Sequence, residues 1–173
     1  YVMQATKTSL DSYVSVLMME NKVVTKKVLE RAGISVPGGY EYTSPEAGMA
    51  DYRMYAGKPV VIKPKSTNFG LGITILKHNY DETDFKGALQ IAFEHDNTLL
   101  IEKFIPGREF RIFIINDEVV GILHRVPANV TGDGVLNIGQ LIDRKNEDPL
   151  RGKGYRTPLE KIRKGREEEM FLK

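Results

Sequence analysis

The spacing of apolar and polar residues separates helical from extended segments along the chain. Apolar residues recur at helical intervals over 21–33 and 81–95, and Asn21 and Gly33 suit the start and the end of the first of these helices. Continuous apolar runs bounded by turn residues predict strands instead. The predicted strands are 60–64, 72–76, 99–104, 109–115 and 119–126. Further helices are expected from Pro45 to near Gly57, at 138–145 and at 158–170.

Helices and strands are interleaved without a regular strand–helix–strand repeat, so the pattern favours an α+β fold over a parallel α/β sheet. The first two predicted strands form a hairpin, and residues 1–19 form a linker that runs into a short helix. A length of 173 residues, with 41% hydrophobic and 28% charged residues, fits one or two globular domains.

Charge and cysteine content exclude several classes of protein. The net charge of +2 gives no general argument for a nucleic-acid or membrane partner, and no apolar run approaches the ~20 residues of a membrane span. The absence of cysteine excludes a disulfide scaffold and a thiolate site, and it is compatible with a reducing cytoplasm. Since Tyr1 is not a natural start, we expect the sequence to begin inside a longer protein.

Residues 63–72 carry the most informative local pattern. A predicted strand delivers Lys63, and a loop rich in serine, threonine, asparagine and glycine follows directly. Backbone N–H groups of such a loop can line an anion site, and the lysine adds a point charge. An ordinary hairpin loop with one exposed lysine would show the same pattern, and the P-loop motif is absent.

Two later segments carry candidate ligand-binding side chains. After the strand at 99–104 the chain bends at Pro106-Gly107, which places Glu109 where its carboxylate can accept hydrogen bonds from two ribose hydroxyls. In the alternative reading, the strand is followed by an ordinary turn and Glu109 is solvated. Arg111 and Arg125 lie among apolar strand residues and need a partner or solvent. That partner is either a ligand phosphate or carboxylate, or an internal glutamate. No histidine or carboxylate group shows metal-ligand spacing.

Taken together, these segments resemble an ATP-grasp ligase. The matching motifs, in chain order, are 21–22, 33–37, 60–64, 66–72, 101–104 and 107–110. More narrowly, 20–27, 63–72 and 125–130 resemble the glutathione synthetase module of bacterial bifunctional glutamate–cysteine ligase/glutathione synthetase proteins. Cyanophycin synthetase, which shares the Arg-Val-Pro-Ala and Gly-Asp-Gly features, is the closest rival. The resemblance covers about residues 12–165.

The resemblance implies an ATP-grasp fold of two α+β lobes with mainly antiparallel sheets. The N-terminal lobe is expected at 20–98 and an incomplete C-terminal lobe at 99–173, after the linker at 1–19. The chain is expected to end before the strands that carry the Mg²⁺ (or Mn²⁺) ligands of the full-length enzyme, so these ligands are expected beyond residue 173.

The resemblance also assigns roles to individual residues. It implies that Lys22 and Lys63 contact ATP phosphates, that Glu109 binds the ribose, and that Arg111 and Arg125 are catalytic arginines at the transferred phosphate or the substrate carboxylate. The implied residues of the loop over the triphosphate are Lys65, Ser66, Thr67, Asn68, Phe69, Gly70 and Gly72. The implied residues of the adenine hinge are Glu102, Lys103, Phe104 and Ile105.

The implied reaction is ATP-dependent ligation of a carboxylate and an amine. A substrate carboxylate attacks the γ-phosphate of ATP, and the amine of a second substrate then displaces phosphate from the acyl phosphate. The implied substrates are γ-glutamylcysteine and glycine, and catalysis consists mostly of positioning and charge neutralisation. A glutamate–cysteine ligase module is expected N-terminally in the same parent chain, in the cytoplasm.

We expect the fragment alone to be inactive and to bind ATP weakly at best. A cyanophycin-synthetase-like peptide ligase and a non-catalytic nucleotide-binding module are the alternative functions.

Overall fold

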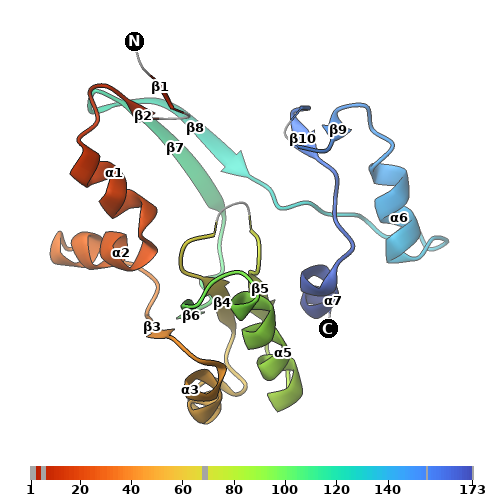
Figure 1. Cartoon of the computed structure of the whole chain (residues 1–173). Coiled ribbons are helices and arrows are strands. Elements are labelled where there is room, and N and C mark those ends of the chain that lie inside the picture. The colour runs from red at the N-terminus through yellow and green to blue at the C-terminus, as the bar shows by residue number, and fades with distance from the viewer. Residues whose placement is uncertain (1–2, 5–6, 68–69, 155, 173) are drawn as a thin grey trace. The chain divides into compact units, whose positions relative to one another are not determined.

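The computed structural model describes residues 3–4, 7–67, 70–154 and 156–172, which belong to two compact units (Figure 1). The first unit holds the residues up to Ile105 together with those from Arg166 onward, and the second unit holds Pro106–Gly165. Among the described residues, three of the four sheets are purely antiparallel. Helices and mainly antiparallel strands together make an α+β fold, as predicted.

A four-stranded antiparallel sheet forms the centre of the first unit. Its strands are β3 (Gly39–Tyr42), β4 (Val60–Pro64), β5 (Thr74–Leu76) and β6 (Leu99–Lys103). The order across the sheet is β3-β6-β4-β5, so β6 is an inner strand between β3 and β4. The pairing of β4 with β5 confirms the predicted hairpin.

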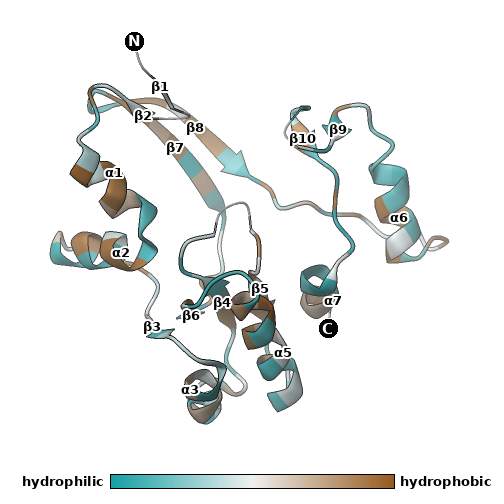
Figure 2. Ribbon diagram, in the orientation of Figure 1, coloured by the Kyte–Doolittle hydropathy of each residue, from teal (hydrophilic) through white to brown (hydrophobic). Residues whose placement is uncertain are grey.

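Helix α5 (Glu82–Phe93) covers one face of this sheet and closes the core. A capping box fixes its first turn, because the Asp81 carboxylate accepts from the Asp84 N–H while the Asp84 carboxylate accepts from the Asp81 N–H. Figure 2 shows apolar positions along α5 and the neighbouring strands. The buried side chains between helix and sheet are Val60, Ile62, Leu76, Phe85, Ala88, Leu89, Ala92, Leu99 and Ile101.

Two helices at the start of the chain meet at Asn21. The Asn21 side chain accepts hydrogen bonds from the N–H groups of Val23 and Val24, and it thereby starts α2 at the predicted residue. Gly33, at φ +75°, ends the helix, and the Ile34 N–H donates to the Leu29 carbonyl as in a Schellman motif. The two helices are α1 (Tyr13–Glu20) and α2 (Lys22–Arg31), and the strands β1 (Met3–Gln4) and β2 (Lys7–Thr8) precede them.

Three short helices complete the first unit: α3 (Pro45–Ala50), α4 (Tyr52–Tyr55) and α7 (Arg166–Leu172). Ser44 caps α3 by accepting from the Ala47 N–H, as expected of the Ser-Pro pair. The segment predicted as one helix up to Gly57 is divided at Asp51. An aromatic group packs on the ring of Phe85, with members Tyr52, Tyr55 and Tyr80.

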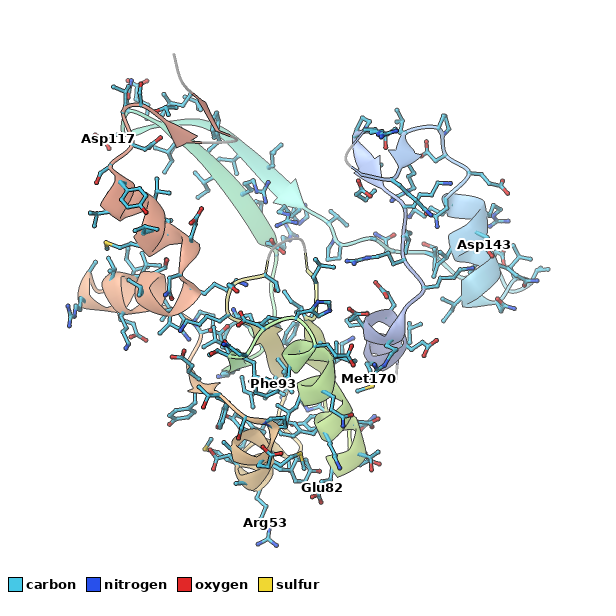
Figure 3. The ribbon with its side chains drawn as sticks, viewed as in Figure 1. Arg53, Glu82, Phe93, Asp117, Asp143 and Met170 are labelled. Atoms are coloured by element: carbon cyan, nitrogen blue, oxygen red, sulfur yellow. The ribbon has the colours of Figure 1, made fainter. Side chains whose placement is uncertain are left out.

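The second unit is built around a two-stranded ribbon of β7 (Glu109–Ile115) and β8 (Glu118–Arg125). Asn116 and Asp117 both have positive φ and form a two-residue hairpin turn, and Asp117 lies at the tip of the ribbon in Figure 3. Helix α6 follows at Ile138–Lys145, and the parallel pair β9 (Arg151–Gly152) and β10 (Leu159–Glu160) follows the helix.

Two sequence-based expectations differ from the structure. The predicted helix at 158–170 is wrong in its first half, because the N–H groups of Leu159 and Lys161 donate to carbonyls beside β9, at Leu150 and Gly152. Strand β3 was not predicted. The expected lobe boundary at 98/99 stays a prediction, and in the structure β6 belongs to the sheet of the first unit.

Candidate functional site

A buried carboxylate on β6 brings two lysines together in the first unit. The Glu102 side chain is only 3% exposed. Its Oε1 lies 2.7 Å from Nζ of Lys26 on α2, and its Oε2 pairs with Nζ of Lys63 on β4. Residues 61 and 102 are paired across β4 and β6, so the side chains of Val61, Lys63 and Glu102 lie on the sheet face opposite the α5 core. This face therefore carries charge where the other face carries the core.

The neighbouring strand leaves room for that carboxylate. Gly39 is paired with Glu102 across β3 and β6. A Cβ at residue 39 would overlap the carbonyl oxygen of Ile101 and lie 2.9 Å from Cγ of Glu102. Only glycine therefore fits at this position of β3.

Lys22 brings a third ammonium to the same region. Its Nζ donates to the carbonyl oxygens of Pro64, at 3.1 Å, and Thr67, at 2.6 Å. Burial lowers the pKa of Lys22, and the nearby positive charge of Lys63 lowers it further, while Asp96 and Glu102 act in the opposite direction. Lys22, Lys26 and Lys63 carry three positive charges, whereas Glu102 and Asp96 carry two negative charges. The region therefore has an excess of positive charge, which favours an anionic ligand.

The loop between β4 and β5 is held at both of its ends. The Ser66 N–H and hydroxyl both donate to Oδ2 of Asp96, at 2.8 and 2.6 Å. Burial acts to raise the pKa of Asp96, but the hydrogen bonds from Ser66, together with those from the N–H groups of Thr98 and Asn97, outweigh it and hold that pKa below its usual range. Nζ of Lys65 lies 2.7 Å from Oε1 of Glu41, and the Thr67 hydroxyl donates to the Leu71 carbonyl.

Two glycines shape the far end of this loop. Gly70 and Gly72 have φ of +77° and +70°, which glycine adopts most readily. A Cβ at Gly72 would also meet the His95 ring at 2.6 Å. The predicted loop residues Asn68 and Phe69 lie outside the described residues.

The predicted adenine hinge follows directly on the inner strand. The N–H of Lys103 donates to the Gly38 carbonyl, and the N–H of Phe104 donates to the Pro59 carbonyl. These two donors are therefore committed to the protein itself. Ile105 comes after these bonds, and its side chain is 56% exposed.

The remaining predicted residues lie on the ribbon of the second unit. Glu109 and Arg125 are paired across β7 and β8, and Nη1 of Arg125 lies 2.9 Å from Oε1 of Glu109. Both side chains are more than half exposed, and such a pair contributes about 0–1 kcal/mol, so a ligand can replace either partner at low cost. Arg111 is also exposed and lies opposite Leu123. Of the two partners expected for Arg125, a ligand or an internal glutamate, the structure contains the glutamate, Glu109.

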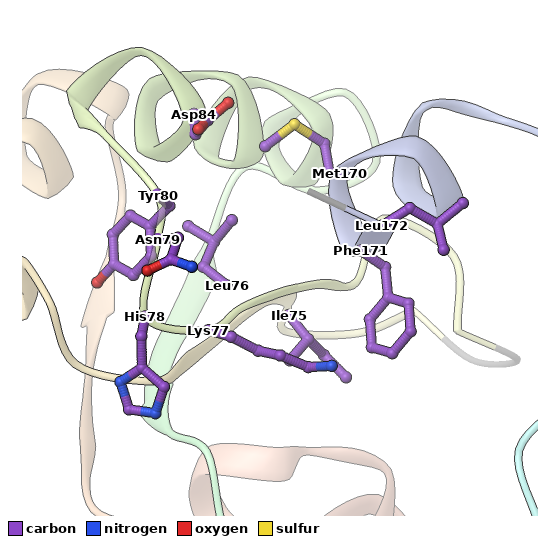
Figure 4. Close-up of a pocket in the computed structure, with 10 residues that line it drawn as sticks. All are labelled: Ile75, Leu76, Lys77, His78, Asn79, Tyr80, Asp84, Met170, Phe171 and Leu172. Atoms are coloured by element: carbon purple, nitrogen blue, oxygen red, sulfur yellow. The ribbon is translucent and has the colours of Figure 1, made fainter.

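A separate pocket of about 300 Å³ lies in the first unit beside α7 (Figure 4). At the edge of this pocket, Nζ of Lys77 lies over the ring of Phe171, 4.4 Å from the ring centroid. None of the predicted site residues lines this pocket. Its lining residues are Ile75, Leu76, Lys77, His78, Asn79, Tyr80, Asp84, Met170, Phe171 and Leu172.

Within the part of the chain that the structure describes, no group of three or more histidine, aspartate or glutamate side chains is placed to hold a metal ion. In the same part of the chain, every helix is too short or too polar to span a membrane.

Sequence reasoning missed three residues of this site. Lys26 follows Lys22 at the i, i+4 spacing of one helix face, which was a usable signal. Gly39 follows Gly38 in the sequence, a pair that is typical of turns, and no local pattern separates the two positions. Asp96 is thirty residues from Ser66, and no local pattern indicates that they meet.

Comparisons with known proteins agree with this geometry. A family model described as the RimK-like ATP-grasp domain matches residues 19–145. The chain is 60% identical over 172 residues to the glutathione biosynthesis bifunctional protein GshAB of Desulfotalea psychrophila, and 55% identical over 173 residues to the protein of the same name from Clostridium perfringens. These alignments cover 99% and 100% of this chain but 22% of each relative, so the chain spans about a fifth of their length.

A solved structure gives a similar result. The D-alanine–D-alanine ligase of Bacillus anthracis, crystallised in complex with ATP, matches 62% of this chain and 34% of its own chain, with a TM-score of 0.50 and 30% identity. The predicted ATP-grasp fold is therefore confirmed. Since the family match runs from α1 through Lys22, Lys63 and Glu102 to the end of α6, the chain belongs to the RimK-like ATP-grasp domain family.

Proposed function

We propose that this chain is the ATP-binding part of a glutathione synthetase, an ATP-dependent ligase that joins γ-glutamylcysteine to glycine. The observation that carries the proposal is the group of Lys22, Lys26 and Lys63 around the buried Glu102 carboxylate. Its excess positive charge lies beside a glycine-containing loop, which suits a polyphosphate. The choice of glutathione synthesis rests on the names of two relatives that are 55% and 60% identical to this chain.

In this proposal the lysines neutralise the nucleotide. The ammonium groups of Lys22 and Lys63 bind phosphate oxygens, and the loop from Lys65 to Gly72 closes over the triphosphate. Lys22 then gives up the loop carbonyls to which it now donates, at Pro64 and Thr67. Because the N–H groups of Lys103 and Phe104 are already bonded, adenine uses other groups of the hinge, such as the backbone of Ile105.

The reaction has two stages, a phosphoryl transfer followed by an acyl transfer. An oxygen of the γ-glutamylcysteine carboxylate attacks the γ-phosphorus of ATP, and ADP leaves with the electron pair of the broken P–O bond. The glycine amine then attacks the acyl phosphate, loses a proton and expels inorganic phosphate, which forms the amide. Arg111 and Arg125 stabilise the transferred phosphate or the substrate carboxylate, and Glu109 exchanges Arg125 for the ribose hydroxyls.

The setting of the reaction follows from the same assignment. We place the chain in a bifunctional protein with a glutamate–cysteine ligase module, in the cytoplasm where ATP is available. The Mg²⁺ (or Mn²⁺) of the nucleotide is expected to be held by residues outside this chain.

A chimera tests the proposed function. The matching 172 residues of the Desulfotalea psychrophila relative are replaced by those of this chain, and ADP release is measured with γ-glutamylcysteine and glycine. We expect glycine-dependent ADP release, and we expect Lys63→Ala in the chimera to abolish nearly all of it. A chimera that folds but gives no such release, or that is indifferent to Lys63→Ala, would contradict the proposal.

A further inference from the structure

The charged face of the sheet holds one cation more than the proposed phosphate contacts need. Lys26 lies one helical turn after Lys22 on α2, and its side chain is 18% exposed. Its Nζ is 2.7 Å from Oε1 of Glu102, a strong charge-assisted hydrogen bond. The proposed function counts this lysine in the excess positive charge but gives it no contact with the nucleotide.

The geometry of the shared carboxylate supplies one. Lys26 is bonded to Oε1 of Glu102 and Lys63 to Oε2, so the two lysines do not compete for the same oxygen. A carboxylate that is 3% exposed cannot rely on water to balance its charge. If Lys63 moves its ammonium toward a phosphate, Glu102 needs another cation that stays in place.

We infer that Lys26 is a positioning residue that stays on Oε1 of Glu102 and thereby frees Lys63 to bind a nucleotide phosphate. This inference rests on the proposed function, because it takes ATP as the ligand of Lys63. Without Lys26, Lys63 is the remaining counter-ion of a buried anion, and the nucleotide has to compete with Glu102 for it. Lys26 itself touches neither the nucleotide nor the substrates.

The first test needs no nucleotide. Amine-specific reductive methylation, followed by mass spectrometry of the peptide that contains Lys63, measures how readily that amine is released from Glu102. In Lys26→Met we expect methylation of Lys63 to be roughly tenfold slower, the lower end of what one charge-assisted hydrogen bond contributes. Partial unfolding would instead speed methylation, so the sign separates the two effects. Lys27→Met is the matched control, since this neighbouring lysine is exposed.

The second test is a titration of the 173-residue chain with ATP. We expect Lys26→Met to raise the Kd for ATP about tenfold, equivalent to ~1.4 kcal/mol, and Lys26→Arg to restore it because guanidinium can also donate to Oε1. In a Glu102→Gln background the anion that competes for Lys63 is gone, so Lys26→Met should change the Kd less than twofold.

These measurements separate the possible failures. If the unchanged chain binds ATP but Lys26→Met matches Lys27→Met in both Kd and methylation rate, the inference is refuted and the proposed function stands. If Lys26→Met costs the same affinity in the Glu102→Gln background, Lys26 binds the nucleotide directly and the inference is wrong. If the unchanged chain does not bind ATP, the same titration is made on the chimera, and a folded chimera that also does not bind ATP contradicts the proposed function together with the inference.

Discussion

Gly39 should be the most sensitive backbone position near the charged face, and Gly39→Ala tests this directly. The added methyl group would overlap the Ile101 carbonyl oxygen and lie 2.7 Å from Cα and 2.9 Å from Cγ of Glu102. Two of these three atoms belong to the backbone, so rotation of a side chain cannot relieve the contacts. Strand β3 has to move away from β6, or the Glu102 carboxylate has to shift against its lysines.

The expected cost follows from three opposing terms. Overpacking of this kind costs about 1–3 kcal/mol, and a lost β3–β6 hydrogen bond adds about 0.5–1.5 kcal/mol. The reduced flexibility of the unfolded chain offsets about 0.4–1 kcal/mol of this. We therefore expect Gly39→Ala to lower the free energy of unfolding by about 2 kcal/mol, within a range of about 0.5–4 kcal/mol.

Urea denaturation followed by circular dichroism measures the effect. Gly38→Ala is the matched control, because a Cβ at residue 38 would meet no atom within 4 Å. We expect the control to be as stable as the unchanged chain or up to about 1 kcal/mol more stable, because it gains the same unfolded-state term without a clash. Equal unfolding midpoints for the two variants would refute the packing argument at Gly39.

Three further predictions concern the core, the loop and the ribbon. Phe85→Ala, at a fully buried ring in contact with three tyrosines, should lower the free energy of unfolding by about 3–5 kcal/mol in urea, and a loss below 1 kcal/mol would contradict the assigned core. Because the folded-state pKa of Asp96 is lowered, its ionised form stabilises the fold above the usual aspartate pKa of about 3.9, and this contribution disappears as the pH falls through the lowered value. The stability difference between the unchanged chain and Asp96→Asn should accordingly be larger at pH 7 than at pH 3, whereas a pH-independent difference would argue against the Ser66 bonds. Glu109→Gln should change stability by less than about 1 kcal/mol because its ion pair is exposed, yet weaken ATP binding in a titration; unchanged affinity would remove Glu109 from the ribose site.

Local chemistry explains which parts of the fold could be predicted. Asn21, Ser44 and Asn116 act through hydrogen bonds or turn conformations within a few residues, so the sequence pattern was sufficient to place them. The backbone of residues 159–161 bonds to residues 150–152 instead, and this tertiary pairing overrides the helical pattern at 158–170. Strand β3 was not predicted, because it begins at Gly39, where a Cβ would overlap Ile101 and Glu102 of the neighbouring strand, and this contact cannot be read from the sequence.

The candidate site shows the same division. Lys63 could be found because a strand and a glycine-containing loop adjoin it in the sequence. Lys26 and Asp96 act over 76 and 30 residues, on Glu102 and Ser66, and such contacts appear only when the sheet is assembled. Residues 102–105 were predicted to hold adenine, but the sequence did not indicate that two of their N–H groups donate to the Gly38 and Pro59 carbonyls.

The ribbon of β7 and β8 has a consequence for handling the isolated polypeptide. Large aliphatic and aromatic groups on both of its faces are about half exposed or more, including Ile112, Phe113 and Ile122 at 55–61%. Each of its two strands also has an outer edge, where backbone N–H and C=O groups lie outside the β7–β8 ladder, as in any two-stranded sheet. Exposed apolar surface of this kind promotes aggregation as the protein concentration rises. Light scattering should therefore increase steeply with protein concentration, and it should decrease when Ile112 and Ile122 are replaced by threonine.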